Sequence, residues 1–362
     1  MALAFCSLRA EDSFKPGEIW PDNKGVHINA HGGGLLLRDG VYYWYGEHKT
    51  KGSGGNVANV GIHCYSSKDL YHWKDEGIAL EVAPAGSGSD IEKGSIIERP
   101  KVIYNRKTGK YVMWFHLERK GRGYQSACAG IAAGDSPTGP FTFIRSTRAS
   151  AGHWPEGYSE ALKNGPVRAA GKNFSGGSLP GQVTLDELNI VKRDFDRGQM
   201  VRDMTLFVDD DDNAYHIYSS EENSTLHIAL LSSDYLSHSG KYARIFPGRF
   251  MEAPALFKRE GRYYLLMSGC TGWAPNAGRS AVADSIWGPW VELKNPFQGK
   301  GANTSFRSQS TYVVEAPGKK GNFIYMGDRW NPGNAIDGRH IWLPIRFENT
   351  QPVIEWAESW KY

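Results

Sequence analysis

One glutamate in this sequence stands among side chains that would hinder its solvation. Glu252 lies in MEAPALFK, between Met251, Ala253 and Pro254, directly before a predicted pair of strands. Burial disfavours the charged form of a carboxyl group and raises its pKa. A carboxyl group that is protonated near neutral pH can act as a general acid. The alternative from these residues alone is a structural glutamate at a strand edge, paired with an arginine.

Other polar side chains stand at comparable places, where a predicted apolar strand begins. They are His31 in AHGGGLL, Glu98 in IERPKVIYN, Asp203 in RDMTLF and Gln309 in SQSTYVV, and Glu47 ends the strand that follows His31. Carboxyl groups that come close together push their pKa values apart, which creates separate acid and base roles. Each residue could instead make only a structural hydrogen bond. A functional site requires a fold that gathers these distant strand ends.

A repeated unit of the sequence predicts such a fold. A turn followed by an aromatic, alternating strand occurs at residues 40–47, 109–116, 213–220, 261–269 and 321–328, each time after another apolar strand. Further strand-like segments follow each pair. Five repeats of three or four antiparallel strands predict an all-β protein, a five-bladed β-propeller, rather than an array of β-sandwiches. The first strand of each blade would then line a central channel and present its polar end to one pocket.

The composition agrees with this fold and excludes several functions. The chain has 362 residues, 12 Trp, 18 Tyr and 43 Gly, which favours aromatic strands joined by glycine turns. A net charge of +3 gives no basis for nucleic-acid binding, and no apolar run approaches the roughly 20 residues of a membrane span. The cysteines Cys6, Cys64, Cys128 and Cys270 lack metal-ligand spacing, and Cys64 and Cys128 are expected to be core thiols.

Two segments fall outside the repeats. Residues 1–12 (MALAFCSLRAED) are similar to the end of a secretory signal, so we expect a periplasmic or secreted protein. Residues 13–362 are expected to form a single catalytic propeller domain, interrupted by an insertion at about 148–200. Such an insertion either walls one side of the pocket, with His153 and Trp154 as contacts, or forms a surface loop.

The sequence resembles glycoside hydrolase family 43, and within it the branch of exo-β-1,3-galactanases. The resemblance covers roughly residues 20–347 and is carried by INAHGGGLL, YYWYGEH, IERPKVIYN, GDSPTGPF, RDMTLFVDDD, MEAPALFK, SGCTGW, SQSTYV, GDRW and IWLPI. It implies a five-bladed propeller that cleaves glycosidic bonds with inversion. In inverting enzymes the acid and the water-activating group lie about 6.5–9.5 Å apart.

The resemblance also implies roles for individual residues. Glu252 matches the general acid, and Asp203 matches the aspartate that tunes the pKa of the acid and orients it. The usual general base is an aspartate on the first strand of blade one, and AHGGG contains none. In the galactanase branch a glutamine that matches Gln309 holds the water instead, through its imidic tautomer or by orientation alone. Glu98 matches a glutamate in contact with the substrate and is the substitute for Gln309.

Further residues are predicted to bind the sugar. Glu47, Tyr124 and Thr271 match sugar-binding positions, Trp273 is expected to stack on a pyranose face, and His31 is expected at the substrate. No cofactor is required. Family members can hold a structural cation in the channel, to which His31 or His340 could contribute, but no ligand spacing supports a metal site.

The predicted function is that of an exo-acting, inverting glycoside hydrolase. It would release terminal galactose from β-1,3-galactan or plant arabinogalactan oligosaccharides, as a monomer with no nucleic-acid or membrane partner. Alternatives within the family are α-L-arabinofuranosidase, β-D-galactofuranosidase and β-xylosidase activity. The alternative from another class is a sugar-binding propeller without catalysis, which the missing aspartate favours and the retained pair of Glu252 and Asp203 opposes.

Overall fold

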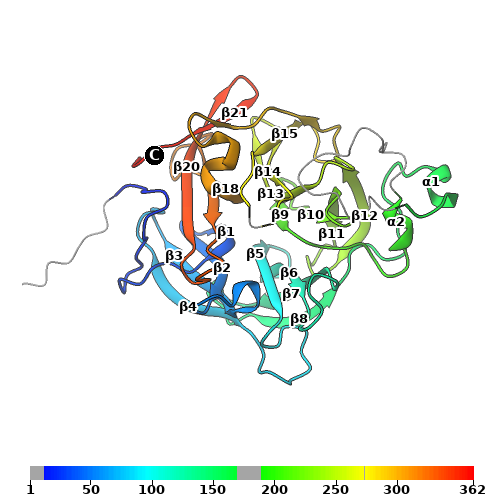
Figure 1. The fold of residues 1–362 in the computed structure, drawn as a ribbon, viewed down its shortest axis with the longest axis horizontal. Coiled ribbons are helices and arrows are strands. Elements are labelled where there is room, and N and C mark those ends of the chain that lie inside the picture. Colours follow the sequence, from blue (N-terminus) through cyan, green and yellow to red (C-terminus); the bar gives the residue numbers. More distant parts are fainter. Residues whose placement is uncertain (1–11, 169–188, 273) are drawn as a thin grey trace, which may run out of the picture.

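Five sheets, antiparallel except for one short parallel edge strand, fan around one axis in the computed structural model, which describes residues 12–168, 189–272 and 274–362 (Figure 1). The prediction of an all-β, five-bladed propeller is confirmed. The leader predicted for residues 1–12 falls outside the described residues except for Asp12, and so does the predicted stacking residue Trp273. None of the described helices is long and apolar enough to cross a membrane.

Each blade places its strands in order from the axis outward. Blades one and two contain β1 (His31–Arg38), β2 (Val41–Lys49), β3 (Asn59–Ser67), β4 (Lys74–Glu81), β5 (Ile96–Asn105), β6 (Lys110–Glu118), β7 (Cys128–Gly134) and β8 (Thr142–Thr147). Blades three and four contain β9 (Met204–Val208), β10 (Ala214–Ser220), β11 (Thr225–Leu231), β12 (His238–Ile245), β13 (Met251–Arg259), β14 (Arg262–Gly269), β15 (Arg279–Ala283) and β16 (Val291–Glu292). Blade five contains β18 (Gln309–Glu315), β19 (Phe323–Arg329), β20 (Arg339–Glu348), β21 (Gln351–Glu355) and β17 (Phe297–Gln298).

The core lies between the blades. Alternating apolar side chains leave each sheet on both faces and form five buried clusters, each shared by two neighbouring blades. Between blades one and two, for example, Tyr45 and Ile62 pack with Ile97 and Met113. Cys64 and Cys128 are buried free thiols, as predicted. Packing on both faces of every sheet fixes the strands whose inner ends build the site.

The ring is closed by segments from both ends of the described chain. Phe14 and Trp360 exchange two backbone hydrogen bonds of 2.9 and 3.1 Å. The ring of Phe14 also packs against Trp360, Tyr71 and Trp342 at centroid distances of 4.5, 4.7 and 5.7 Å. This aromatic cluster joins blade five to blade one.

The innermost strands kink where they reach the site. The pairing register shifts after His31 in β1, after Glu98 in β5 and after Glu252 in β13. The residues that follow adopt a left-handed backbone, with φ of 61° at Gly32, 58° at Arg99 and 53° at Ala253. Such bulges redirect side chains at the rim of a sheet. The polar residues predicted at strand starts therefore stand at equivalent kinks in three blades.

The insertion between blades two and three lies away from the axis. Its described residues include two short helices, α1 (Glu160–Asn164) and α2 (Ile190–Arg193), which lie beyond the outer strand β12 (Figure 1). Trp154 stacks on Phe195 at 4.2 Å, and the backbone oxygen of His153 accepts a hydrogen bond from Tyr242 of β12. The hypothesis that these two residues wall the pocket is therefore wrong, because they pack on the outer edge of blade three.

Candidate active site

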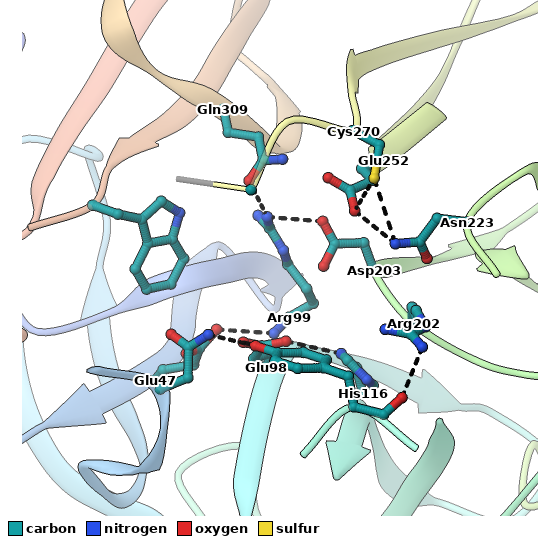
Figure 2. Close-up of a pocket in the computed structure, with 14 residues that line it drawn as sticks. Glu47, Glu98, Arg99, His116, Arg202, Asp203, Asn223, Glu252, Cys270 and Gln309 are labelled. Carbon is teal, nitrogen blue, oxygen red and sulfur yellow. Dashed lines mark hydrogen bonds and ion pairs between the residues drawn. The ribbon is translucent and has the colours of Figure 1, made fainter. Parts of the chain in front are cut away.

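The inner ends of the blades enclose a cavity of about 340 Å³ at the axis (Figure 2). Its lining is polar and draws on all five blades: Glu47, Asn56, Glu98, Arg99, His116, Tyr124, Arg202, Asp203, Asn223, Glu252, Cys270, Gly272, Gln309 and Trp330. Pockets for small ligands span about 300–1,000 Å³. The cavity therefore suits a ligand of one or two sugar rings.

Glu252 is the first residue of the site to consider, because its environment favours the protonated form. Burial first, and the charge of Asp203 second, raise the pKa of its carboxyl group to about 7 against the opposing effects of Cys270, Arg99 and Arg202. Oε1 of Glu252 accepts hydrogen bonds from Asn223 Nδ2 at 2.9 Å and from Cys270 Sγ at 3.2 Å. A carboxyl group with this pKa can donate a proton near neutral pH.

Arg99 joins the acid side of the cavity to Gln309. Its Nη2 atom lies 2.9 Å from Asp203 Oδ2 and also donates to Gln309 Oε1. Its Nη1 atom donates to the backbone oxygen of Ser310 at 3.1 Å. Gln309 Nε2 donates to Ser268 Oγ at 2.9 Å, so both ends of the amide have a fixed orientation.

Glu98 is held in the opposite state to Glu252. Burial disfavours its charge, but His116 outweighs burial through a hydrogen bond and its own charge, and the pKa of Glu98 falls to about 2. Nδ1 of His116 lies 2.9 Å from Glu98, and Nε2 lies 3.0 Å from the buried Glu118. These two carboxylates overcome the burial of the imidazole and raise the pKa of His116 to about 9. Tyr124 donates a further hydrogen bond of 2.8 Å to Glu98.

Glu47 is a second carboxyl group with a raised pKa. It is fully buried, and burial raises its pKa to about 7 although Lys49 Nζ lies 2.9 Å away. The backbone NH of Arg99 donates to its Oε1 at 3.0 Å. The cavity thus contains carboxyl groups in two states: Glu98 is ionised at neutral pH, whereas Glu47 and Glu252 titrate near it. Such a separation is the pattern of an acid–base site.

The structure brings together six of the nine residues predicted for the site. Glu47, Glu98, Tyr124, Asp203, Glu252 and Gln309 all line the cavity. His31 and Thr271 do not. The His31 ring is buried 5.3 Å from that of Trp330. The Thr271 hydroxyl donates to the backbone oxygen of Ala274 within its own loop, and Trp273 lies outside the described residues.

Several lining residues escaped the sequence reasoning. Arg99 directly follows the predicted carboxylate Glu98, and that adjacency was the available signal; Arg202, beside Asp203 in VRDMTLF, was expected at the strand start of blade three and does line the cavity. His116 lies opposite Glu98 near the end of strand β6, so the predicted hairpin pairing could have placed it. Asn223 and Cys270 lie in turns, where alternation along a strand gives no information about direction.

A cation in the channel was predicted only as a possibility, and of the two clusters in the described residues that could hold one, the buried cluster around His31 suits it poorly. His31, Asp328 and His340 have potential ligand atoms within 4.8 Å of one another. However, His340 already uses Nδ1 toward Asp328 at 2.9 Å and Nε2 toward the backbone oxygen of Ile28 at 3.1 Å. A hard cation such as Ca²⁺ takes six to eight oxygen ligands, and this cluster offers one carboxylate. No step of the chemistry is assigned to a metal.

A propeller whose axis holds a sugar-sized cavity, a carboxyl acid with a raised pKa and an ionised carboxylate defines a glycoside hydrolase. Comparison with known proteins gives the family. The model of glycosyl hydrolases family 43 matches residues 186–298. A family 43 β-1,3-galactosidase, solved with galactodeoxynojirimycin, is 50% identical, with a TM-score of 0.89 over 96% of this chain and 100% of that chain. The chain belongs to glycoside hydrolase family 43.

More distant relatives have the same architecture. The exo-β-1,3-galactanase of Clostridium thermocellum is 34% identical, with a TM-score of 0.74 over 96% of this chain and 66% of that chain. The exo-β-1,3-galactanase of Phanerochaete chrysosporium, solved with β-1,3-galactotriose, is 29% identical, with a TM-score of 0.77 over 97% of this chain and 68% of that chain. A β-D-galactofuranosidase of Aspergillus niger is 34% identical over 117 residues, which are 31% of this chain and 34% of that protein. The chain thus matches about a third of this curated relative.

Proposed function

We propose that this enzyme is an exo-acting β-1,3-galactanase that releases terminal galactose from β-1,3-linked galactan with inversion of configuration. The observation that carries the proposal is the pair formed by Glu252, with a pKa of about 7, and Asp203, whose charge contributes to that value inside the central cavity. The half-identical relative solved with galactodeoxynojirimycin supports galactose as the sugar. A cavity of about 340 Å³ supports the removal of single end units.

On the acid side, Glu252 donates its proton to the glycosidic oxygen. The bond from the anomeric carbon to that oxygen breaks, and its electron pair stays with the leaving sugar. Burial and the nearby charge of Asp203 together raise the pKa of the acid to about 7, because both oppose a second negative charge at this place. Arg99 holds Asp203 in place through its 2.9 Å ion pair.

On the opposite side, Gln309 orients the attacking water. Its Oε1 faces the guanidinium of Arg99, which only donates, so an imidic O–H at this atom would meet another donor. The hydrogen-bonding pattern therefore favours the amide form of Gln309. In that form Gln309 orients the water and does not remove a proton from it. Glu98, kept ionised by His116, then takes the water proton as the new C–O bond forms.

The test of the acid is Glu252→Gln, with Glu260→Gln as the matched control. Glu260 is an exposed turn residue of the same blade, with 71% of its side chain accessible. We expect Glu252→Gln to lose about 10²–10⁴-fold in kcat/KM on β-1,3-galactobiose. An aryl β-galactoside with an acidic leaving group needs little protonation, so most of its turnover should survive. Full activity of Glu252→Gln on the disaccharide would remove Glu252 as the acid.

The competing functions are separated by the substrate panel. The partial match to a β-D-galactofuranosidase motivates aryl β-D-galactofuranoside, with aryl α-L-arabinofuranoside and aryl β-xyloside beside it. We expect aryl β-D-galactopyranoside and β-1,3-galactan to be the preferred substrates. Preference for a furanoside would reassign the sugar, and galactose binding without hydrolysis of any substrate would establish a sugar-binding propeller.

A further inference from the structure

Cys270 contacts the proposed acid directly. It follows β14, and its Sγ atom lies 3.2 Å from Oε1 of Glu252 (Figure 2). Asn223 Nδ2 lies 2.9 Å from the same oxygen and 3.6 Å from Cys270 Sγ. In the part of the chain that the structure describes, no donor of comparable geometry reaches Oε2. The two oxygens of this carboxyl group therefore have different surroundings.

The chemistry of the donors fixes the direction of these hydrogen bonds. Burial, together with the neighbouring Glu252, raises the pKa of the Cys270 thiol to about 12, so the sulfur carries its hydrogen. A thiol donates weakly and an amide nitrogen donates only. Oε1 thus faces two hydrogen atoms and must act as an acceptor. A proton on Oε1 would meet both donors, so the acidic proton belongs on Oε2.

We propose that Cys270 is a positioning residue that reserves Oε1 as an acceptor, so that Oε2 carries the proton delivered to the glycosidic oxygen. This inference rests on the proposed function of Glu252 as the acid. In the step itself, the Oε2–H bond breaks, the proton passes to the leaving oxygen, and Glu252 becomes a carboxylate. Solvent returns the proton to Oε2 after the product leaves.

The thiol has a second effect, because a donor to Oε1 also stabilises the carboxylate. Cys270 lowers the pKa of Glu252 and so opposes burial and Asp203. One neutral hydrogen bond contributes about 0.5–1.5 kcal/mol, which corresponds to about 0.4–1 pH unit. Cys270→Ala should therefore move the alkaline limb of kcat/KM upward by about half a pH unit to one unit. Cys270→Ser retains a donor and should leave the limb at or below its wild-type position.

The experiment compares Cys270→Ala and Cys270→Ser with Cys128→Ala in the full chain. Cys128 is a buried free thiol of blade two that does not line the cavity, so it controls for loss of a core sulfur. We measure kcat/KM between pH 4.5 and 9 on β-1,3-galactobiose and on an aryl β-galactoside. We expect the alanine variant to lose about tenfold or more on the disaccharide, since misaligned groups cost up to about 10²-fold. Its loss on the aryl substrate should be smaller, and serine should restore most of the rate.

Equal losses in the serine and alanine variants, on both substrates and with an unmoved alkaline limb, would mean that Cys270 only packs. A carbon-detected NMR titration of the Glu252 carboxyl group gives a readout without turnover. If the wild-type enzyme cleaves no galactoside, the proposed function fails. The titration would still show whether Cys270 lowers the pKa of Glu252. An unchanged Glu252 pKa in Cys270→Ala would overturn the inference.

Discussion

Replacement of Asp203 by asparagine tests the electrostatic basis of the site. Asp203 lies in the same cavity as Glu252, and its charge is the largest contribution after burial to the raised pKa of the acid. Asparagine keeps the shape of the side chain and removes the charge. Because the acid works in its protonated form, a lower pKa of Glu252 must move the alkaline limb of kcat/KM to lower pH.

The size of the shift follows from the charges. A close charged neighbour shifts a carboxyl pKa by about 1–3 units. We take about one unit, or roughly 1.4 kcal/mol, because the ion pair with Arg99 already offsets part of the charge of Asp203. The pKa of Glu252 would fall from about 7 to about 6. At pH 7 the protonated fraction would then fall from about a half to about a tenth, and turnover by about fivefold from this cause alone.

The assay is the pH profile of kcat/KM on β-1,3-galactobiose between pH 4.5 and 9. Asp210→Asn is the matched control, since Asp210 is an exposed turn carboxylate with 87% of its side chain accessible. If Asp203→Asn acted only by losing the contact with Arg99, activity would fall equally at every pH. If it acts by losing the negative charge of Asp203, the alkaline limb of kcat/KM moves to lower pH. An alkaline limb that stays in place or moves upward in Asp203→Asn would refute the electrostatic reasoning.

Three further predictions concern pH and stability. The folded state raises the pKa of Glu252 to about 7, so folding of the wild-type protein is favoured below about pH 4.5 and loses this contribution as pH rises through about 7. Glutamine cannot ionise. In thermal unfolding, Glu252→Gln should therefore be more stable than wild type by about 1–3 kcal/mol at pH 8, with a nearly unchanged stability at pH 5. Equal stabilities of the two proteins at pH 8 would contradict this. His116→Asn removes the charge that holds the pKa of Glu98 at about 2, so the acidic limb of kcat/KM should move upward, and an unmoved limb would count against Glu98 acting as a carboxylate. Phe14→Ala opens the aromatic cluster between blades five and one and should cost about 3–5 kcal/mol in urea unfolding, with kcat/KM of the folded protein unchanged.

The fold and the polar residues at the strand ends were predictable, because both follow from the order of residue types within short segments of the sequence. Aromatic alternation after glycine turns predicted the hairpins, and the hairpins placed Glu98, Asp203, Glu252 and Gln309 at the axis. Arg99 was not predictable, because neighbouring residues of a regular strand face opposite sides. The register shift after Glu98 and the left-handed φ of 58° at Arg99 let both residues line the cavity.

The turn that follows β14 shows the same limit. Thr271 was predicted to bind the sugar, yet Cys270 and Gly272 on either side of it line the cavity while its own hydroxyl bonds within the loop. In an irregular segment, the type of a residue does not tell which way its side chain points. The proposed role of Cys270 therefore depends on coordinates, whereas that of Glu252 could be argued from its neighbours.

The left-handed backbone at Arg99 and Ala253 has a consequence for engineering. A non-glycine residue in this region costs on the order of 1–3 kcal/mol, and at Arg99 the guanidinium contacts with Asp203 and Ser310 help to offset that cost. Glycine at position 99 would relax the main chain, but it would also leave the carboxylate of Asp203 without its ion-pair partner, and breaking a buried pair costs about 3–5 kcal/mol. The loss exceeds the strain that is relieved. Directed evolution of this enzyme toward higher temperature should therefore leave Arg99 unchanged.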